Sequence, residues 1–282
     1  MTTIALLTIR EAARRRILWV LLALTIISVV VTGWGTERLA TLAREDGVAE
    51  LQIRVGVSQI LILVAFMFSF VLAMTAAFLG APAIASDLES GVALALLARP
   101  IRRADYVVGR WLGLVAVIVA YAVGSGLFEI AVVRVLTGHA PPEPWIAVAF
   151  LAAQAVVLLS IALLLSTRLP AIASGAICVV LFGLAWMAGV FAGIGRVFGV
   201  DALVAVAQAS RWLFPSDGLW RGVIYGLEPP LVVLEATRFG AAADANPFYA
   251  ASPPPVAFVV WSAVWVAATL AAAVWSVNRR EI

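Results

Sequence analysis

The sequence contains no lysine, one histidine and one cysteine among its 282 residues. A P-loop nucleotide site needs a lysine to hold the phosphates, and a Schiff-base enzyme needs one as its nucleophile, so this chain can build neither. His139 has no second histidine or cysteine nearby to complete a metal site, and Cys178 has no disulfide partner. We therefore predict no catalytic residue, no metal site and no cofactor bound by this chain. Any energy that it uses must come from another chain.

Charged residues are also scarce, at 12% of the chain, whereas hydrophobic residues make up 64%. Apolar runs of about 18 or more residues indicate membrane helices, because lipid offers the backbone no hydrogen-bonding partner. Six such runs predict an all-α, polytopic membrane protein, with residues 1–282 forming one integral membrane domain. The predicted spans are residues 17–34, 55–85, 107–133, 146–166, 171–197 and 256–277.

The distribution of charge predicts the orientation of these spans. With the N-terminus inside, eleven arginines and five acids lie on the inner side, a net charge of +6. Eight arginines and ten acids then lie on the outer side, a net charge of −2, and Glu129 within the third span supplies the remaining −1. The positive-inside rule therefore places both termini in the cytoplasm. The positive charge follows from topology, so we expect no nucleic-acid partner.

Two segments outside the spans have a helical pattern. Residues 1–16 combine apolar residues with a basic face, which predicts a helix lying in the inner membrane interface and contacting lipid. Simple positive-inside anchoring is the alternative. Residues 199–255 predict short helices on the outer, extracytoplasmic face, which either enter the interface or form a packed cap, and an extracytoplasmic protein is a further candidate partner. The predicted membrane-interface or gate residues are Arg14, Arg15, Arg16 and Arg110.

The inner loop of residues 86–106 is the most informative part of the chain. We predict a short helix over 89–98, with acids at its N-terminus favouring the positive end of the helix dipole and Pro100 ending it. Leu94 and Leu97 share one exposed apolar face that could enter a partner's groove. A helix lying on the membrane is the alternative. The residues predicted to act in this loop are Asp87, Glu89, Gly91, Leu94, Leu97, Arg99, Pro100, Arg102 and Arg103.

Within the spans, small residues recur at four-residue spacing. Ala185, Gly189 and Gly193 flatten one face of the fifth span, which makes that face a candidate dimer seam. Gly109 and Gly113 likewise allow close approach of a neighbouring backbone at the start of the third span.

Glu129 is the unusual charge inside a span, since buried carboxylates are costly in lipid. A structural ion pair of Glu129 with Arg134 and Arg54 near the outer edge is the expected role.

The inner loop resembles the signature of type-two ABC exporter permeases. The shared order is Asp87-x-Glu89-x-Gly91, a leucine-rich turn with Leu94, Leu96 and Leu97, then Pro100, Arg103, Gly109 and Arg110. Val92, Arg102 and Arg110 stand where the family usually has Thr, Ser and Lys. The topology fits as well, and the chain is most similar to permeases found beside copper-enzyme maturation systems such as that of nitrous oxide reductase.

The resemblance implies a function and an assembly. The inner loop would hold a coupling helix docked on a cytoplasmic ATPase subunit that binds ATP and Mg²⁺. A second permease copy, or a similar chain, would complete an exporter in the cytoplasmic membrane of a prokaryote. Two other classes stay open. A proton-coupled secondary carrier would titrate Glu129, and a passive membrane scaffold would transport nothing.

Overall fold

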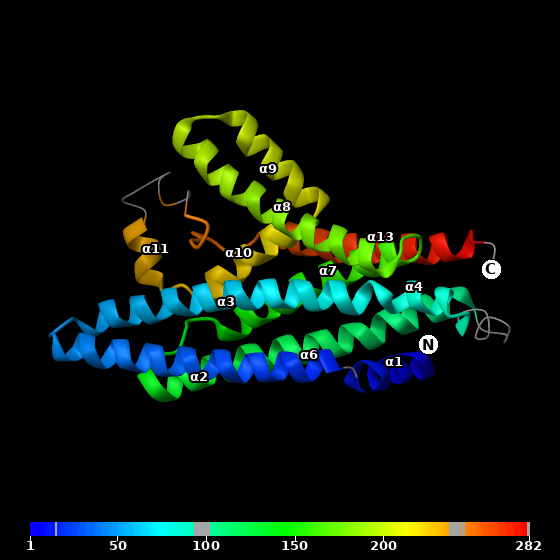
Figure 1. The fold of residues 1–282 in the computed structure, drawn as a ribbon. Helices are drawn as coiled ribbons and strands as arrows, with labels where there is room; N and C mark the ends of the chain where they lie inside the picture. The colour runs from blue at the N-terminus through cyan, green and yellow to red at the C-terminus, as the bar shows by residue number, and fades with distance from the viewer. Residues whose placement is uncertain (15, 93–101, 237–242, 244–245, 281–282) are drawn as a thin grey trace.

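The computed structural model describes residues 1–282 except 15, 93–101, 237–242, 244–245 and 281–282, and the side chains of 17 and 235 (Figure 1). All regular elements in this described part are helices, which confirms the all-α fold class. They are α1 (Thr2–Arg14), α2 (Arg16–Glu45), α3 (Glu50–Gly80), α4 (Pro82–Glu89), α6 (Arg103–Thr137), α7 (Pro144–Ser166), α8 (Ala171–Phe198), α9 (Asp201–Leu213), α10 (Ser216–Leu227), α11 (Pro230–Ala236) and α13 (Val256–Asn278).

Six of the described helices are long and apolar enough to cross a membrane, as predicted. They are α2, α3 with its continuation α4, α6, α7, α8 and α13, and each predicted span lies within one of them. Both termini lie at one end of the bundle, which we call the terminal end, together with the end of α4 and the start of α6 (Figure 1). We call the opposite end, where α2 turns into α3, the distal end.

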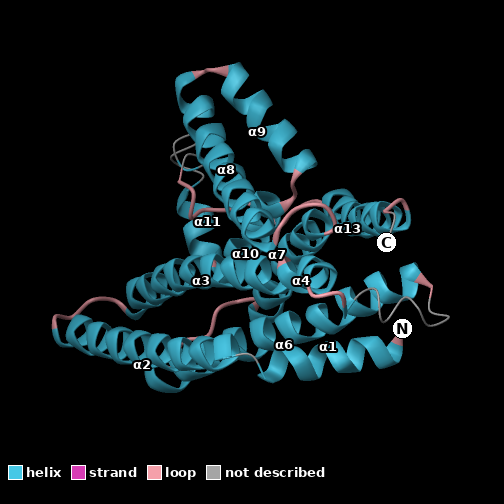
Figure 2. Ribbon diagram, turned by 45° about the vertical axis from the view of Figure 1, so that its right-hand side comes forward, coloured by secondary structure: helices cyan, strands magenta, loops and turns pink. Residues whose placement is uncertain are grey.

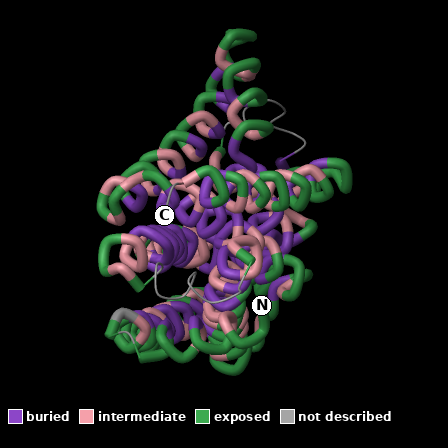
Figure 3. Tube along the Cα trace, turned by 90° about the vertical axis from the view of Figure 1, so that its right-hand side faces the viewer, coloured by how far each residue is buried: buried purple, intermediate pink, exposed green. Residues whose placement is uncertain are grey.

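Helix α7 is the centre of the bundle. It contacts α3, α4, α6, α8, α10 and α13, and residues on all of its sides are buried. Viewed from the terminal end, the buried positions gather between the helices and the exposed ones lie at the periphery (Figure 3). A helix that is apolar all round, as α7 is, can be stable in this position because neighbouring helices cover most of its surface.

Helix α1 packs along the first turns of α6 (Figures 1 and 2). A Cβ added at Gly109 would lie 2.8 Å from Cβ of Ile4, and one at Gly113 would lie 2.7 Å from the carbonyl oxygen of Ala5. The predicted close approach of a neighbouring backbone at these glycines is therefore confirmed. That α1 lies in a membrane interface stays a prediction.

The chain after α8 turns back into the bundle. Helices α8 and α9 form a hairpin whose tip stands away from the other helices (Figure 2). At its base, the indole of Trp261 donates to the carbonyl oxygen of Trp212 at 3.0 Å, and that of Trp265 donates to Leu213 at 2.8 Å. Trp265 lies nine residues, or about 13 Å, into α13. The end of α9 therefore reaches beyond the first two turns of a spanning helix.

Helix α10 packs closely against α7, and at its first turn against α13, through a row of glycines. Cβ atoms added at Gly218, Gly222 and Gly226 would lie within 2.2–2.6 Å of Phe258, Phe150 and the backbone nitrogen of Ala147, respectively. This four-residue spacing is visible in the sequence, but it was not recognised there as a packing signal. Hydrogen bonds of a buried side-chain amide also hold α10 against α7. Gln154 of α7 accepts a hydrogen bond from Ser69 of α3 at 2.6 Å and donates to the carbonyl oxygen of Ser216 at 3.2 Å.

Glu228, directly after α10, is a buried carboxyl whose charge should affect stability. Its Oε2 accepts a hydrogen bond from the backbone nitrogen of Ala250 at 3.0 Å, and its Oε1 is buried with no hydrogen-bond partner in the described structure. Burial raises the pKa of Glu228 to about 7, against the opposing effect of the Ala250 hydrogen bond. The folded protein therefore holds a proton here that the unfolded chain releases at lower pH.

We expect the folded protein to lose stability as pH rises from about 4.5 to about 7, and no further above that range. The loss should be on the order of 3 kcal/mol. Glu228→Gln should remove this dependence, whereas Glu45→Gln, an exposed control, should keep it. Thermal unfolding in detergent across pH 5–8 measures the difference. Parallel pH profiles for wild type and Glu228→Gln would contradict the assignment.

Candidate functional site

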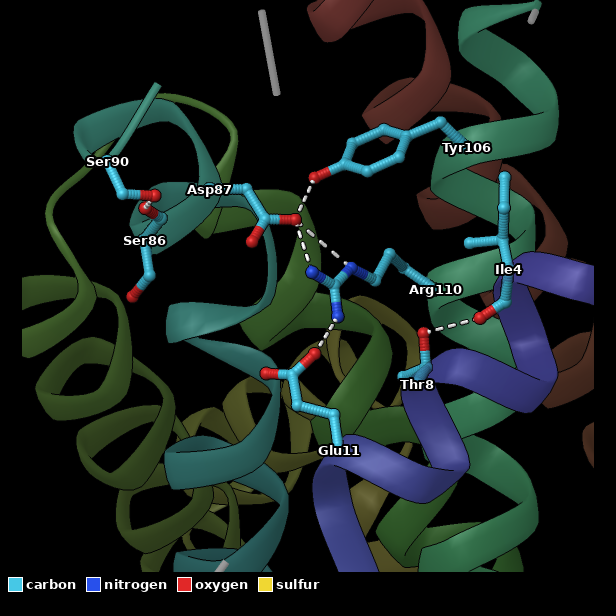
Figure 4. A network of polar contacts seen from close by, with 8 residues as sticks. All are labelled: Ile4, Thr8, Glu11, Ser86, Asp87, Ser90, Tyr106 and Arg110. Atoms are coloured by element: carbon cyan, nitrogen blue, oxygen red, sulfur yellow. Dashed lines mark hydrogen bonds and ion pairs between the residues drawn. The ribbon is translucent and has the colours of Figure 1, made fainter. Parts of the chain in front are cut away.

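A polar cluster joins three helices at the terminal end (Figure 4). Arg110 of α6 lies between Asp87 of α4 and Glu11 of α1. Its Nε donates to Oδ2 of Asp87 at 3.1 Å, its Nη2 donates to the same oxygen, and its Nη1 donates to Oε2 of Glu11 at 2.5 Å. Tyr106, one turn earlier on α6, donates its hydroxyl hydrogen to Oδ2 of Asp87 at 2.6 Å. One guanidinium thus connects α1, α4 and α6, and we call these four residues the terminal cluster.

The environment makes the terminal cluster a strong connection. The side chains of Arg110 and Asp87 are 11% and 13% exposed, so water screens their attraction little, whereas Glu11 is 44% exposed. The planar guanidinium directs separate N–H groups to each carboxylate, which fixes direction as well as distance. The Asp87 carboxylate accepts hydrogen bonds from both Arg110 and Tyr106, and Glu11 accepts one from Arg110. The cluster can therefore transmit displacement between the three helices that it joins.

Local sequence places Asp87 where it meets Arg110. Pro82, at the start of α4, lacks the N–H that would continue the hydrogen-bond ladder of α3, so α4 begins there as a separate helix. Gly91, with φ of 76°, then ends α4 in the left-handed conformation that glycine adopts most easily. Asp87 consequently lies in the last turns of a helix held between these two breaks.

This arrangement corrects the predicted start of the loop helix. Asp87 and Glu89 belong to the end of α4, and the chain breaks at Ser90 and Gly91 because of the positive φ of Gly91. The two acids therefore belong to α4 and do not form the N-terminus of a helix that begins at Glu89. Helix α6 begins at Arg103, so the connection is shorter than the predicted 86–106. Leu94, Leu97, Arg99, Pro100 and Arg15 lie outside the described residues.

Of the other predicted residues at this end, Glu89, Arg102, Arg14 and Arg16 are exposed. Arg103 has a different contact from the one expected of a loop residue. It donates to the carbonyl oxygens of Val277 and Arg280, both at 2.9 Å, and so caps the end of α13. Cations are favourable at helix C-termini, which explains this position.

Sequence reasoning missed two further arginine contacts at this end. Arg168 donates to the Ser276 hydroxyl at 2.8 Å, and Arg280 donates to the carbonyl oxygen of Thr167 at 2.7 Å. They join α13 to the α7–α8 turn. Their basic character near span ends was visible, but positive-inside patterning explains such residues equally well, so no local signal singled them out.

The prediction that Ala185, Gly189 and Gly193 form a dimer seam is wrong. All three are buried within the single chain. A Cβ at Gly189 would lie 2.1 Å from Oδ1 of Asp217, the second residue of α10. The small residues make room for the re-entering chain, so this face is already occupied and cannot receive a second copy.

The predicted ion pair of Glu129 is also wrong. Both carboxylate oxygens of Glu129 are buried without a hydrogen-bond partner in the described structure, although the side chain of Thr32 lies beside them. Arg134 and Arg54 are both exposed. Five helical positions place Glu129 and Arg134 about 140° apart around α6, so one faces the core and the other faces away.

The described residues contain no group of three or more His, Cys, Asp or Glu side chains that could hold a metal ion. His139 is half-buried and its Nε2 shares a hydrogen bond with the Ser58 hydroxyl at 2.9 Å. The thiol of Cys178 donates to the carbonyl oxygen of Leu158 at 3.3 Å inside the core. Both side chains therefore make hydrogen bonds within the chain.

Comparison with known proteins places the chain in a family. No match is found among curated proteins. The family model described as ABC-2 family transporter protein matches residues 2–210, which is most of the chain and includes the terminal cluster and five of the six candidate spans. The chain therefore belongs to the ABC-2 transporter family, as a multi-pass membrane permease subunit of an ABC transporter whose family implies a separate ATP-binding partner subunit.

Proposed function

We propose that this permease is an exporter driven through the α4–α6 connection by a cytoplasmic ATPase subunit that binds ATP and Mg²⁺. The terminal cluster is the observation that carries the proposal. Asp87 lies three positions before the start of the connection at Ser90, and Arg110 lies about two turns into α6 after it. A displacement of the connection would therefore move α4 and α6 together, and Glu11 would pass it to α1.

The proposed orientation places the terminal end in the cytoplasm of a prokaryotic cell and the chain in its inner membrane. The distribution of arginine supports this, since the inner side has a net charge of +6 and the outer side a net charge of −2 under this topology. Both termini, the end of α4 and the start of α6 lie at the same end, which is the end that a cytoplasmic ATPase would contact under this topology (Figure 1). A second permease copy would complete the transporter through a surface other than the face around Gly189.

The proton-coupled carrier remains the competing class, because Glu129 is a buried carboxylate inside a span. Besides Glu129, the described residues lining the cavity beside it are apolar, among them Leu61, Phe68 and Leu151. A proton relay would need further titratable groups leading to the carboxylate. Their absence from this part of the structure favours the ATPase-driven permease.

The proposal is tested by co-purification. Leu94→Asp with Leu97→Asp should reduce the ATP-binding subunit that co-purifies from native membranes to background, because two carboxylates cannot enter an apolar groove. Its ATPase activity should disappear from the preparation with it. The permease itself should insert normally. Mass spectrometry identifies the retained subunit.

A matched control is Val48→Asp with Leu51→Asp, an exposed apolar pair of the same spacing at the distal end. This variant should retain the ATP-binding subunit at the wild-type level. Undiminished co-purification and ATPase activity in the Leu94 and Leu97 double variant would show that the connection does not bind the ATPase.

A further inference from the structure

A cavity of about 300 Å³ lies between α2, α3 and α6. Its wall is mostly apolar, and the hydroxyls of Thr25, Ser28 and Tyr121 are the polar groups among its described residues. Ile27 of α2 and Met67 of α3 belong to the wall and are also exposed on the outside of the bundle. The cavity is therefore accessible from the side of the bundle, where spanning helices contact lipid.

A second, smaller cavity of about 30 Å³ adjoins the first and is bordered by Glu129. Phe68 of α3 belongs to the walls of both cavities, so its ring lies between them or along both. The other described residues around the smaller cavity are apolar and come from α3, α6, α7 and α10. A volume of this size has room for one water molecule or for one group of about the same size.

Glu129 is the charged group at this place. Tyr121, Ser125 and Glu129 recur at four-residue spacing on one face of α6, and that face meets α2, because Tyr121 shares a hydrogen bond with Thr25 at 2.8 Å and Thr32 lies beside Glu129. Glu129 is 4% exposed, and both of its carboxylate oxygens have no hydrogen-bond partner in the described structure. A carboxylate in apolar surroundings is costly unless a proton or a cation neutralises it.

We propose that the two cavities bind a hydrophobic amine, with its hydrocarbon body in the larger cavity and its ammonium group directed towards Glu129. An ammonium group is about as large as a water molecule, so the smaller cavity accommodates it. Little water screens a charge in apolar surroundings, so the carboxylate attracts the ammonium even without direct contact and repels an anionic head. The inference concerns binding alone and does not depend on an ATPase partner.

Three ligands with the same hydrocarbon chain test the proposal, namely decylamine, decanol and decanoate. Each is titrated at about pH 7, where the amine is protonated, and the dissociation constant follows from the rise in melting temperature in a neutral detergent. Wild type should bind decylamine at least about tenfold more tightly than decanol, and decanoate no better than decanol. Glu129→Gln should bind decylamine and decanol equally, whereas Glu45→Gln, an exposed control, should keep the preference.

A second variant tests the larger cavity separately from the charge. Ser28→Leu adds bulk to its wall and should weaken the binding of decylamine and decanol alike, by about threefold or more. Ala23→Leu adds similar bulk at an exposed position of the same helix and should change neither. Glu129→Gln should fold as wild type does, because a neutral amide is less costly than a carboxylate in apolar surroundings. The charge is therefore tested even if Ser28→Leu does not fold.

Other occupants of the site give different results. Equal affinity of wild type for decylamine and decanol, unchanged in Glu129→Gln, would show that a proton neutralises the carboxylate, and it would overturn the proposal. The proposal would also fail if sodium or potassium chloride, compared with choline chloride, stabilised wild type but not Glu129→Gln while decylamine had no effect, because the occupant would then be an inorganic cation. A decylamine preference that Glu129→Gln retains would place the amine elsewhere on the protein.

Discussion

Replacing Arg110 with methionine is expected to destabilise the folded protein by about 3–5 kcal/mol and to abolish stimulation of the partner ATPase. The variant keeps the length of the side chain but leaves Asp87 buried beside Glu11 with no cation between them. An uncompensated buried charge costs far more than the pair contributes when intact. Thermal unfolding in detergent measures the first effect, and ATP hydrolysis by the co-purified complex measures the second.

Arg102→Met is the matched control, because Arg102 is an exposed arginine at the start of the same helix. It should leave the melting temperature unchanged. Arg110→Lys should have an intermediate effect, since a lysine retains the charge but cannot donate from a rigid fork to both carboxylates. Type-two ABC exporter permeases usually have lysine at this position, so we expect Arg110→Lys to fold with a contact to one carboxylate. An Arg110→Met protein as stable as Arg102→Met would contradict the bridging role.

A further variant separates stability from coupling. Arg110→Met combined with Asp87→Asn and Glu11→Gln removes the uncompensated charges along with the cation. This triple variant should recover most of the lost stability, because the residues form one network and their effects are not additive. It should still fail to stimulate the ATPase, since the directional contact between α4, α6 and α1 is gone. Restored stimulation would show that the terminal cluster serves only stability.

Replacing Gly226 with valine is expected to prevent correct folding altogether. A Cβ at this position would lie 2.6 Å from the backbone nitrogen of Ala147 and 2.8 Å from the carbonyl oxygen of Glu143, and backbone atoms cannot rotate away. The same approach allows the backbone nitrogen of Glu143 to donate to the carbonyl oxygen of Gly226 at 3.0 Å. Overpacking a well-packed core typically costs about 1–3 kcal/mol, and more where backbone must move.

Fluorescence-detected size-exclusion chromatography should therefore show no monodisperse peak for Gly226→Val. Gly124→Val is the control, because nothing lies within 4 Å of a Cβ added at that glycine in α6. The control should elute as wild type does. A well-folded Gly226→Val protein would mean that the fold does not depend on the close packing of α10 against α7.

The sequence predicted part of the terminal cluster but not its connections. Asp87 and Arg110 were selected from the loop and the start of the third span. Their contact, and the contribution of Glu11, could not be foreseen, because the partners lie 23 and 99 positions apart and meet only after three helices pack. Helical periodicity specifies which side of its own helix a residue occupies, not which neighbour lies opposite.

Glu129 and Gly189 are two residues for which the sequence did not predict the correct neighbour. Proximity in sequence suggested an arginine partner for Glu129, but five positions along a helix point two side chains in different directions. The small-residue face at Gly189 is a close-packing surface, as predicted. The residue that packs against it is Asp217 of the same chain. A face of this kind requires a close neighbour and carries no information on whether that neighbour belongs to the same molecule.

The sequence by itself determined the six spans and the all-α class, because lipid leaves an isolated segment no way to satisfy its backbone except by forming a helix. It also indicated the close approach at Gly109 and Gly113. Only the tertiary structure decided that α9 and α10 re-enter the bundle, that Arg110 connects three helices, and that Glu129 and Phe68 line one cavity. These features depend on the order and rotation in which helices pack, and many pairings bury the same apolar surface equally well.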